Sequence, residues 1–205
     1  MSTESSRTTL AHRLRVLHVP GDPLVLPNVW DCASAHAVAD AGFPVVATGS
    51  AAVALVLGYE DGEGTPADEM LAGHDEQADY IARLRAADPD LVINARTDCL
   101  LRGGARPGER LPETAYRAQA YLEAGADCVY PIGALDEPTV EAVVEAVGGR
   151  PVNVLSLPGG PTPARLAELG VARISFGDQL HRLVHGYLSG LVTAVARGDS
   201  PATAG

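Results

Sequence analysis

Cysteine is scarce in this sequence, with three residues in 205. Cys32, Cys99 and Cys128 are too few and too scattered for a disulfide framework or a structural zinc site. Neither Cys99 nor Cys128 has a recognisable histidine partner that would activate it, so we interpret both as small buried residues. This use of cysteine predicts a reducing, cytoplasmic setting.

Positive charge is also scarce. The chain has 26 acidic residues against 15 basic ones, and its formal net charge is -11. Such a balance excludes the electrostatic footprint of a protein that binds nucleic acid or an anionic membrane. A small anionic substrate would need a local cluster of cationic side chains or backbone N–H groups.

Long apolar runs and several familiar catalytic motifs are missing. No run approaches the roughly 18 residues of a membrane span, and the N-terminus has no apolar core of a secretion signal. The sequence has no phosphate-binding loop, no G-x-G-x-x-G after a strand, no G-x-S-x-G and no H-E-x-x-H. These absences argue against membrane proteins, nucleotide-binding enzymes, serine hydrolases of that type and zinc peptidases.

The chain does have the size and composition of a globular domain. At 205 residues, of which 46% are hydrophobic, it is long enough for one sizeable core. We therefore expect a single domain over residues 1–205, with disordered tails at 1–8 and 199–205.

Short β-branched runs recur along the chain and are typical of strands buried on both faces, as in a parallel sheet covered by helices. Stretches with helical spacing of Ala and Leu separate them. This alternation predicts an α/β fold made of βα units. The expected strands are 24–30, 45–50, 91–96, 128–132, 152–157 and 173–177, and the expected helices are 33–41, 66–87, 112–124, 137–147, 163–169 and 178–197.

One strand, L-V-I-N-A-R-T-D, ends in residues that would be costly to bury unpaired: Asn94, Arg96 and Asp98. In parallel βα folds the carboxyl ends of all strands open on one face, where such folds place their binding sites. We expect this strand to deliver Arg96 to that face, with Asn94 or Asp98 orienting it.

Two further patterns leave alternatives open. The sequence P-G-G-P at 158–161 could offer N–H groups to an anion, but a strand-to-helix turn needs the same residues, and the turn is the simpler interpretation. His181 and His185 have the spacing of a metal-binding pair on a helix. No third ligand is evident, so surface or interface histidines are favoured.

A series of motifs covers about residues 10–195: P-N-V-W-D-C-A-S-A, A-G-F-P-V-V-A-T-G-S-A-A-V-A, L-G-Y-E-D-G-E, I-N-A-R-T-D, Y-L-E-A-G-A-D-C-V-Y, N-V-L-S-L-P-G-G-P and L-G-V-A-R-I-S. In this order they resemble the isocitrate lyase and phosphoenolpyruvate mutase superfamily. The closest resemblance is to its bacterial branch of phosphonomutase or carboxyphosphonoenolpyruvate mutase-like proteins.

The resemblance implies a TIM-barrel-like (β/α) enzyme, a lyase or mutase. Such enzymes make or break a C–C or P–C bond beside an α-oxo carboxylate, through a Mg²⁺-bound enolate. A developing enolate oxygen needs a cation and fixed donors already in place. The residues that match the family are Thr48, Gly49, Ser50 and Ala51 in the loop that binds the substrate carboxylate or phosphonate, Asp61 near the metal and the reacting centre, Arg96 at the enolate oxygen or carboxylate, and Asn153 on the far side of the pocket.

The chain also departs from the family. The strands that carry its main metal-binding carboxylates, in D-x-E-x-G-Y-G or D-x-D-x-G-Y-G and in a Glu-Asp pair, have no counterpart here. Two βα units are therefore missing, which agrees with the count of six strands and predicts a shortened barrel. Asp61 is the one clear family carboxylate left for Mg²⁺. Glu60, Glu63 and Asp98 are nearby in sequence, but G-Y-E-D-G-E-G is more simply a solvated loop, so the metal site is weak or lost.

Two hypotheses follow from the resemblance and this departure. The first is a family-like lyase or mutase acting on a small anionic oxo acid. The second is a catalytically impaired relative that acts as an anion-binding or oligomeric interaction protein. In both cases we expect a homo-oligomer, because the apolar residues of 178–197 have helical spacing and family members commonly exchange a C-terminal helix. The alternative is a helix packed on its own barrel.

Overall fold

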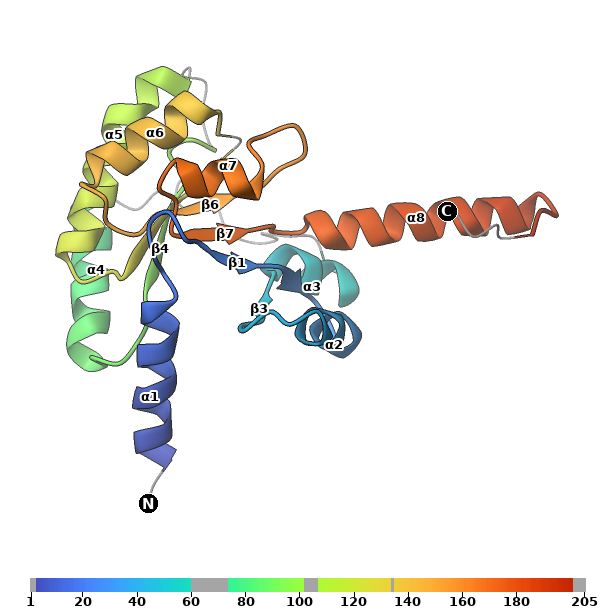
Figure 1. Ribbon diagram of the computed structural model, residues 1–205, viewed down its shortest axis with the longest axis horizontal. Coiled ribbons are helices and arrows are strands. Elements are labelled where there is room, and N and C mark those ends of the chain that lie inside the picture. The colour runs from blue at the N-terminus through green and yellow to red at the C-terminus, as the bar shows by residue number, and fades with distance from the viewer. Residues whose placement is uncertain (1–2, 60–73, 102–106, 134, 201–205) are drawn as a thin grey trace. The chain divides into compact units, whose positions relative to one another are not determined.

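The structure, a computed structural model, describes residues 3–59, 74–101, 107–133 and 135–200 (Figure 1). The chain forms two compact units. The first unit comprises residues 1–26 and 64–175, and the second comprises residues 27–63 and 176–205. The single domain expected over residues 1–205 stays a prediction.

The first unit is built on short parallel strands: β1 (Leu24–Leu26), β4 (Asn94–Thr97), β5 (Cys128–Pro131), β6 (Asn153–Leu155) and β7 (Arg173–Ser175). Strand β4 pairs with β5, and β7 pairs with both β6 and β1. A bridge between Val129 and Val152 links β5 to β6. The strands therefore follow one another in the order β4, β5, β6, β7, β1.

Helices accompany these strands in the chain: α1 (Thr3–Val16), α4 (His74–Ala87), α5 (Pro107–Glu123), α6 (Glu137–Ala146) and α7 (Pro163–Glu168). Local sequence explains where two of them begin. The Asp136 carboxylate accepts a hydrogen bond from the first turn of α6, and the Thr162 hydroxyl does the same for α7. Each cap is followed by a proline in the first turn, where its missing N–H does no harm.

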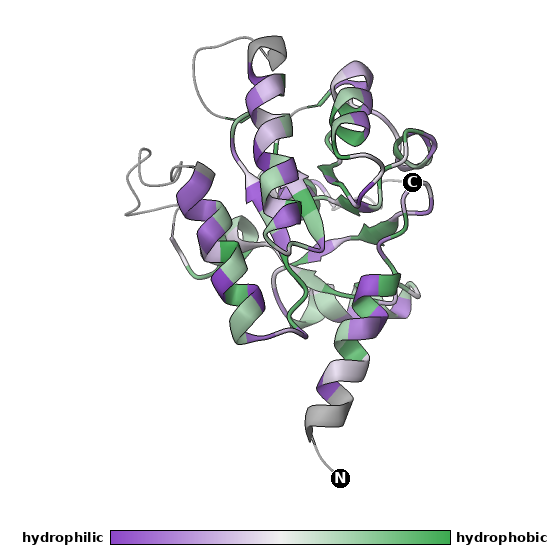
Figure 2. Ribbon diagram, turned by 90° about the vertical axis from the view of Figure 1, so that its left-hand side faces the viewer, coloured by the Kyte–Doolittle hydropathy of each residue, from purple (hydrophilic) through white to green (hydrophobic). Residues whose placement is uncertain are grey.

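The core of this unit lies where the strands meet α5, α6 and α7. Tyr121, Val140, Val143, Leu166 and Ile174 are all at most 2% exposed. In Figure 2 hydrophilic and hydrophobic residues alternate along the helices, as expected where one helix face covers a sheet and the other meets water.

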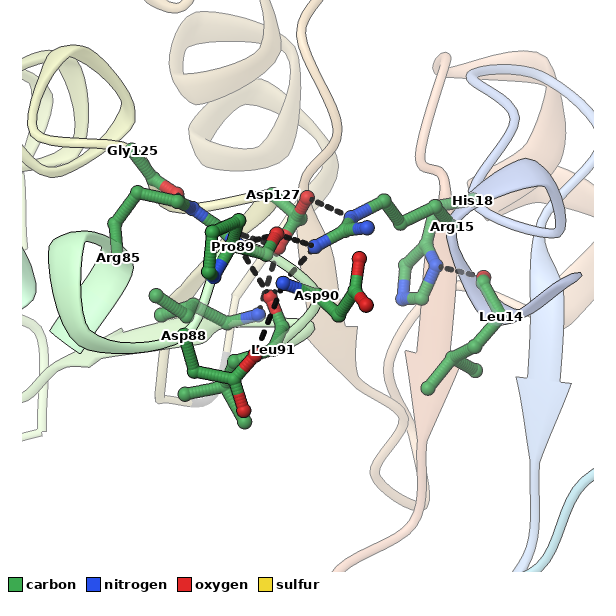
Figure 3. A network of polar contacts seen from close by, with 11 residues as sticks. Leu14, Arg15, His18, Arg85, Asp88, Pro89, Asp90, Leu91, Gly125 and Asp127 are labelled. Carbon is green, nitrogen blue, oxygen red and sulfur yellow. Dashed lines mark hydrogen bonds and ion pairs between the residues drawn. The ribbon is translucent and has the colours of Figure 1, made fainter. Parts of the chain in front are cut away.

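A network of charges ties α1 and α4 to the amino ends of β4 and β5. The Asp127 carboxylate accepts hydrogen bonds from Arg15 Nε at 2.8 Å, Arg85 Nη2 at 2.6 Å and the Ile93 N–H at 2.8 Å. Figure 3 shows the two arginines reaching it from opposite sides. Both also donate to the carbonyl groups of Pro89 and Leu91. The two arginines thus satisfy the carbonyl groups that lie just before β4.

The second unit contains β2 (Asn28–Val29), β3 (Ala47–Thr48), α2 (Cys32–Asp40), α3 (Ser50–Val56) and α8 (Gln179–Ala196). Strands β2 and β3 are parallel. Asp31 and Ser34 form a reciprocal capping box at the start of α2. Helix α8 has a largely exposed apolar side, which includes Leu183 at 63% and Val192 at 59% exposure.

Each of the six strands expected from the sequence is confirmed, although most are shorter than predicted. Residues 24–30 form two strands, β1 and β2, on either side of Pro27, which has no N–H for a ladder. Helix α3 was not anticipated, and α1 begins inside the stretch expected to be a tail. Of the expected helix 66–87, residues 66–73 lie outside the described residues. None of the described helices is long and apolar enough to cross a membrane.

Candidate functional site

The sheet of the first unit has one apolar face and one mixed face, on which polar side chains of β4 to β7 share the register with Leu24, Leu26 and Leu155. Side chains alternate between the faces along each strand. Ala95, Val129, Val154 and Ile174 lie on the face toward the helices and are buried. The opposite face, called the inner face below, carries Asn94, Arg96, Cys128, Tyr130, Asn153, Arg173 and Ser175. The interior of a TIM barrel is usually packed with branched apolar residues, so this polar face points to a binding function.

Arg96 is fixed on the inner face by Asp98. Its Nε donates to Asp98 Oδ1 at 2.5 Å and its Nη2 donates to Oδ2 at 3.2 Å, which is a two-point pairing. The Asp98 side chain is only 7% exposed, whereas that of Arg96 is 44% exposed. The sequence predicted that Asn94 or Asp98 orients Arg96, and in the structure Asp98 does so. One edge of the guanidinium stays accessible to an anion.

Asn153 belongs to a chain of hydrogen bonds on the same face. It is 1% exposed, and its Oδ1 accepts from the Ser175 hydroxyl at 3.3 Å. The Ser175 side chain also bonds to Tyr130. Burial raises the pKa of Tyr130, so the phenol stays protonated and can donate. Burial also raises the pKa of Cys128 to about 12, which makes this thiol a poor nucleophile.

The sequence interpretation missed Tyr130, Arg173 and Ser175. All three lie in strands that were taken as apolar runs buried on both faces. The available signal was the alternation R-I-S in β7 and the tyrosine of C-V-Y-P, which is the register partner of Arg96. Strand pairing is needed to place these residues together, and a single sequence does not reveal it.

The predicted loop Thr48, Gly49, Ser50 and Ala51 lies in the second unit, at the start of α3. Asn28 holds its surroundings: Oδ1 accepts from the N–H groups of Phe176 and Gly177, both at 2.9 Å. A Cβ at position 49 would lie 3.2 Å from the Gly177 carbonyl oxygen, so this close approach favours glycine. Thr48 and Ser50 are exposed.

The structure thus brings Arg96 and Asn153 onto one face and keeps 48–51 as one compact turn of chain. Asp61, predicted for catalysis and metal binding, lies outside the described residues, as do Glu60 and Glu63. The joint role of the two groups of residues stays a prediction.

The described residues do not fit a Mg²⁺ ion. They contain no group of three His, Cys, Asp or Glu side chains that could hold a metal. Asp98 follows β4 directly, and Arg96 already occupies both of its oxygens. Magnesium prefers free carboxylate and water oxygens in octahedral array.

The structure also shows the conformation of P-G-G-P at 158–161 and the surroundings of His181 and His185. In P-G-G-P, the Gly160 N–H donates to the Leu157 carbonyl at 3.1 Å and Gly159 has φ of 82°, which is a type II turn with proline in its second position. The turn borders a cavity of about 480 Å³ that Leu135, Val154 and Leu166 also line.

The His181 ring lies 4.2 Å from that of His185 and 5.1 Å from that of Trp30, measured between centroids. His185 is exposed, as expected of a surface histidine, whereas His181 is buried and is not one. No third metal ligand joins this pair in the part of the chain that the structure describes.

Comparison with known proteins identifies relatives. An uncharacterized protein of Mycobacterium tuberculosis H37Rv, Rv1998c, is 30% identical over 212 aligned positions, which cover 79% of this chain and 80% of the relative. Because 212 exceeds the length of this chain, the alignment must leave gaps in it. Such gaps are consistent with a shortened family member.

Solved structures of similar fold were also found. A candidate phosphonomutase from Burkholderia cenocepacia J2315 is 33% identical with a TM-score of 0.78, over 89% of this chain and 98% of the other. A 2,3-dimethylmalate lyase of the phosphoenolpyruvate mutase and isocitrate lyase superfamily, 20% identical over 96% and 88% of the two chains, has the same fold with a TM-score of 0.73. The predicted fold class, a shortened TIM-barrel-like α/β fold, is confirmed.

The family model described as phosphoenolpyruvate phosphomutase matches in two segments, residues 14–79 and 68–196. Its two segments overlap at residues 68–79, within the stretch where the sequence predicts the missing βα units. Together they span most of the chain. The protein therefore belongs to the phosphoenolpyruvate phosphomutase family.

Proposed function

We propose that this protein binds a small α-oxo carboxylate on the inner face and acts as a lyase or mutase on the adjacent C–C or P–C bond, through an enolate. The observation that carries this proposal is the Arg96–Asp98 pair. It presents a fixed, half-exposed guanidinium at the β4 end of the polar sheet face. In a chain with a net charge of -11, an oriented and accessible local cation indicates an anionic ligand.

The geometry suits the chemistry of a carboxylate or an enolate oxygen. The planar guanidinium donates two parallel hydrogen bonds, and Asp98 on its other edge removes the freedom to turn away. A cation oriented before reaction stabilises developing negative charge without reorganisation. The Tyr130 hydroxyl, protonated and level with Arg96, is a further donor for the same ligand.

By family resemblance, Thr48, Gly49, Ser50 and Ala51 hold the carboxylate or phosphonate group, and Asp61 works near the reacting centre. Relatives of similar fold support the choice of ligand: the structures of oxaloacetate acetylhydrolase and phosphonopyruvate hydrolase hold oxalate, the latter with Mg²⁺. Oxalate mimics the enolate of pyruvate.

A second candidate function is ligand binding without turnover. It is favoured by the lack of a carboxylate cluster for Mg²⁺ among the described residues. The metal supplies charge stabilisation in relatives that use it. If Asp61 does not restore a metal site, Arg96 would still bind the anion, but the enolate would lack its main stabilising cation.

Calorimetric titration of oxalate, with and without Mg²⁺, tests the proposal. We expect binding by the parent protein and its loss in Arg96→Ala. Arg83→Ala is the matched control, because Arg83 is an exposed arginine of α4 that stacks over Tyr80. Equal binding by all three proteins, or none by the parent, would contradict the proposal. Turnover of oxo acids by the parent, abolished in Arg96→Ala, separates the enzyme from the binding protein.

We also infer that the protein is a homo-oligomer that covers the apolar side of α8. Six large apolar residues of this helix are at least half exposed: Leu183, Val184, Tyr187, Leu188, Val192 and Val195. Such a stripe is unusual on a surface that remains in water. Light scattering at micromolar concentration should give a multiple of 21.2 kDa; a monomer there would contradict the inference.

A further inference from the structure

Helix α8 of the second unit carries a buried histidine in its first turn. His181 is 6% exposed, and both of its ring nitrogens are buried without a hydrogen-bond partner among the residues that the structure describes. A neutral imidazole carries one N–H donor and one acceptor nitrogen, so both are left unsatisfied here. Such buried groups are rare in folded proteins. The position of this ring therefore depends on packing and not on hydrogen bonds.

Two other rings pack against His181. The ring centroid of Trp30 lies 5.1 Å away at an interplanar angle of 84°, which is an edge-to-face contact. The ring centroid of His185, on the next turn of α8, lies 4.2 Å away. Trp30 is itself fixed at the start of α2, where its N–H donates to the Ser34 hydroxyl at 3.0 Å. The neutral ring of His181 therefore joins the start of α8 to the start of α2.

A proton on this ring would be poorly accommodated. Four ionisable side chains act on it electrostatically: His185, Arg182, Asp178 and Asp31. The first two can add only positive charge. Both carboxylates already have other partners, because Asp178 pairs with Arg182 and Asp31 accepts from the first turn of α2.

The helix adds to this effect. The N–H groups of its first turn form the positive end of the helix dipole, which disfavours a cation there. Burial, as the largest cause, and the charge of His185 lower the pKa of His181 from its ordinary value of 6.5. The neutral form is therefore the one that fits this position.

The start of α8 also contacts the predicted ligand loop at 48–51. Just before the helix, the N–H groups of Phe176 and Gly177 donate to Asn28 Oδ1, and the Gly177 carbonyl closely approaches Gly49. The side chain of Asp178 forms no hydrogen-bonded cap on α8, so the first turn lacks this local restraint. A movement of the first turn would therefore reach the chain that packs on this loop.

We propose that His181 and His185 form an acid-sensitive switch at the start of α8: the neutral rings hold the first turn of the helix against Trp30, and protonation of His181 releases it. A released ring is hydrated and has its ordinary pKa, so the released form binds more protons than the packed form. The packed form is therefore favoured above about pH 6.5 and loses stability as the pH falls below that value. This inference goes beyond the proposed function, because it needs no ligand.

Fluorescence of Trp30, the only tryptophan of the chain, tests the inference. Over a titration from about pH 8 to about pH 5, we expect the emission of the parent to change reversibly below about pH 6.5, because the indole loses its neighbour and meets water. In His181→Phe, which keeps an aromatic ring but cannot be protonated, the change should be absent. In His185→Gln it should begin at a higher pH, since one cause of the lowered pKa is removed. His36→Gln is the matched control, because His36 is an exposed histidine of α2, and it should titrate as the parent does.

Amide hydrogen exchange distinguishes local release from unfolding of the whole protein. Protection of the Gly177 N–H, corrected for the exchange rate of an unstructured peptide at the same pH, should fall below about pH 6.5. The Ile93 N–H of the first unit, which donates to Asp127, should keep its protection.

Several results would overturn the inference. They are an emission of the parent that stays constant over this pH range, a change that survives in His181→Phe, and an unshifted onset in His185→Gln, whose exposed position makes the substitution mild. Equal loss of protection at Gly177 and Ile93 would indicate general unfolding and would also overturn it. None of these measurements uses a ligand, so their failure leaves the proposed function intact, and a failure of oxalate to bind leaves this inference intact.

Discussion

Replacement of Asp127 by asparagine should destabilise the protein by about 2–3 kcal/mol. The carboxylate is 18% exposed and accepts hydrogen bonds from two arginines and from the backbone of Ile93. Asparagine has nearly the same shape but one acceptor oxygen and no charge, so it keeps some of these contacts. Hydrogen bonds to charged groups contribute about 1.5–3 kcal/mol each, and breaking a fully buried pair costs about 3–5 kcal/mol.

We expect a loss of about 2–3 kcal/mol, less than for a fully buried pair, because the arginines are partly exposed to water. The side chains of Arg15 and Arg85 are 28% and 24% exposed, and both keep their bonds to the carbonyl groups of Pro89 and Leu91. Urea denaturation measures the effect. With a slope of roughly 2 kcal/mol per molar urea, the midpoint should fall by about 1 M.

The matched control is Glu168→Gln. This acid pairs with Arg165 three residues before it on α7, and the two side chains are 66% and 39% exposed. Exposed pairs of this kind contribute at most about 0.5 kcal/mol, so the control should change the midpoint little. Equal effects of the two substitutions, or a loss below about 0.5 kcal/mol for Asp127→Asn, would refute the view that this network holds α1 and α4 to the strands.

Three other substitutions or conditions test separate parts of the fold. Gly49→Ala should lower the melting temperature, by about 1 kcal/mol in free energy of unfolding, because the new Cβ presses on the Gly177 carbonyl; an unchanged melting temperature would argue against the close approach. Thr162→Ala should cost about 1 kcal/mol through the lost cap of α7, and a stability equal to the parent's would argue against that cap. Burial lowers the pKa of His18 below its ordinary value of 6.5, so the unfolded chain takes up more protons and stability should decline as pH falls below about 6.5. His18→Gln should flatten that decline in pH-dependent denaturation, and an identical pH profile would show that His18 does not cause it.

Strand positions could be predicted from the sequence because each strand is a short apolar run bounded by turn residues. The count of six strands was enough to detect the missing βα units. The division of 24–30 into β1 and β2 was not predicted: Pro27 marks it in the sequence, but only the pairing shows that the two strands have different partners. Helix α3 was missed because its residues, S-A-A-V-A-L-V, form a short apolar run that resembles the end of a strand.

Helix α1 shows a different limit. Its first residues, T-E-S-S-R-T-T, are polar and have no apolar stripe, so local sequence predicts a tail. Contacts with residues far along the chain stabilise the helix: Thr8 donates to Asp90, Arg7 pairs with Asp88, and Arg15 binds Asp127. Contacts between residues about 80 to 110 positions apart are not visible in a local pattern.

Some residues of the candidate site could likewise be predicted from the sequence, and others could not. Arg96 and Asn153 could be found because each stands beside an apolar strand core in a motif of the family. Tyr130 could not, because its position beside Arg96 depends on register. Only when β4 and β5 are paired do these two residues stand level.

The central claim is that the inner face of β4 to β7 binds the ligand. Nuclear magnetic resonance of the arginine side-chain N–H groups tests it directly, with signals assigned by single substitutions. Addition of oxalate should shift the Nε–H signal of Arg96 and leave that of Arg85, in the structural network, unchanged. Oxalate binding, detected by calorimetry, that leaves the Arg96 signal in place would contradict the account.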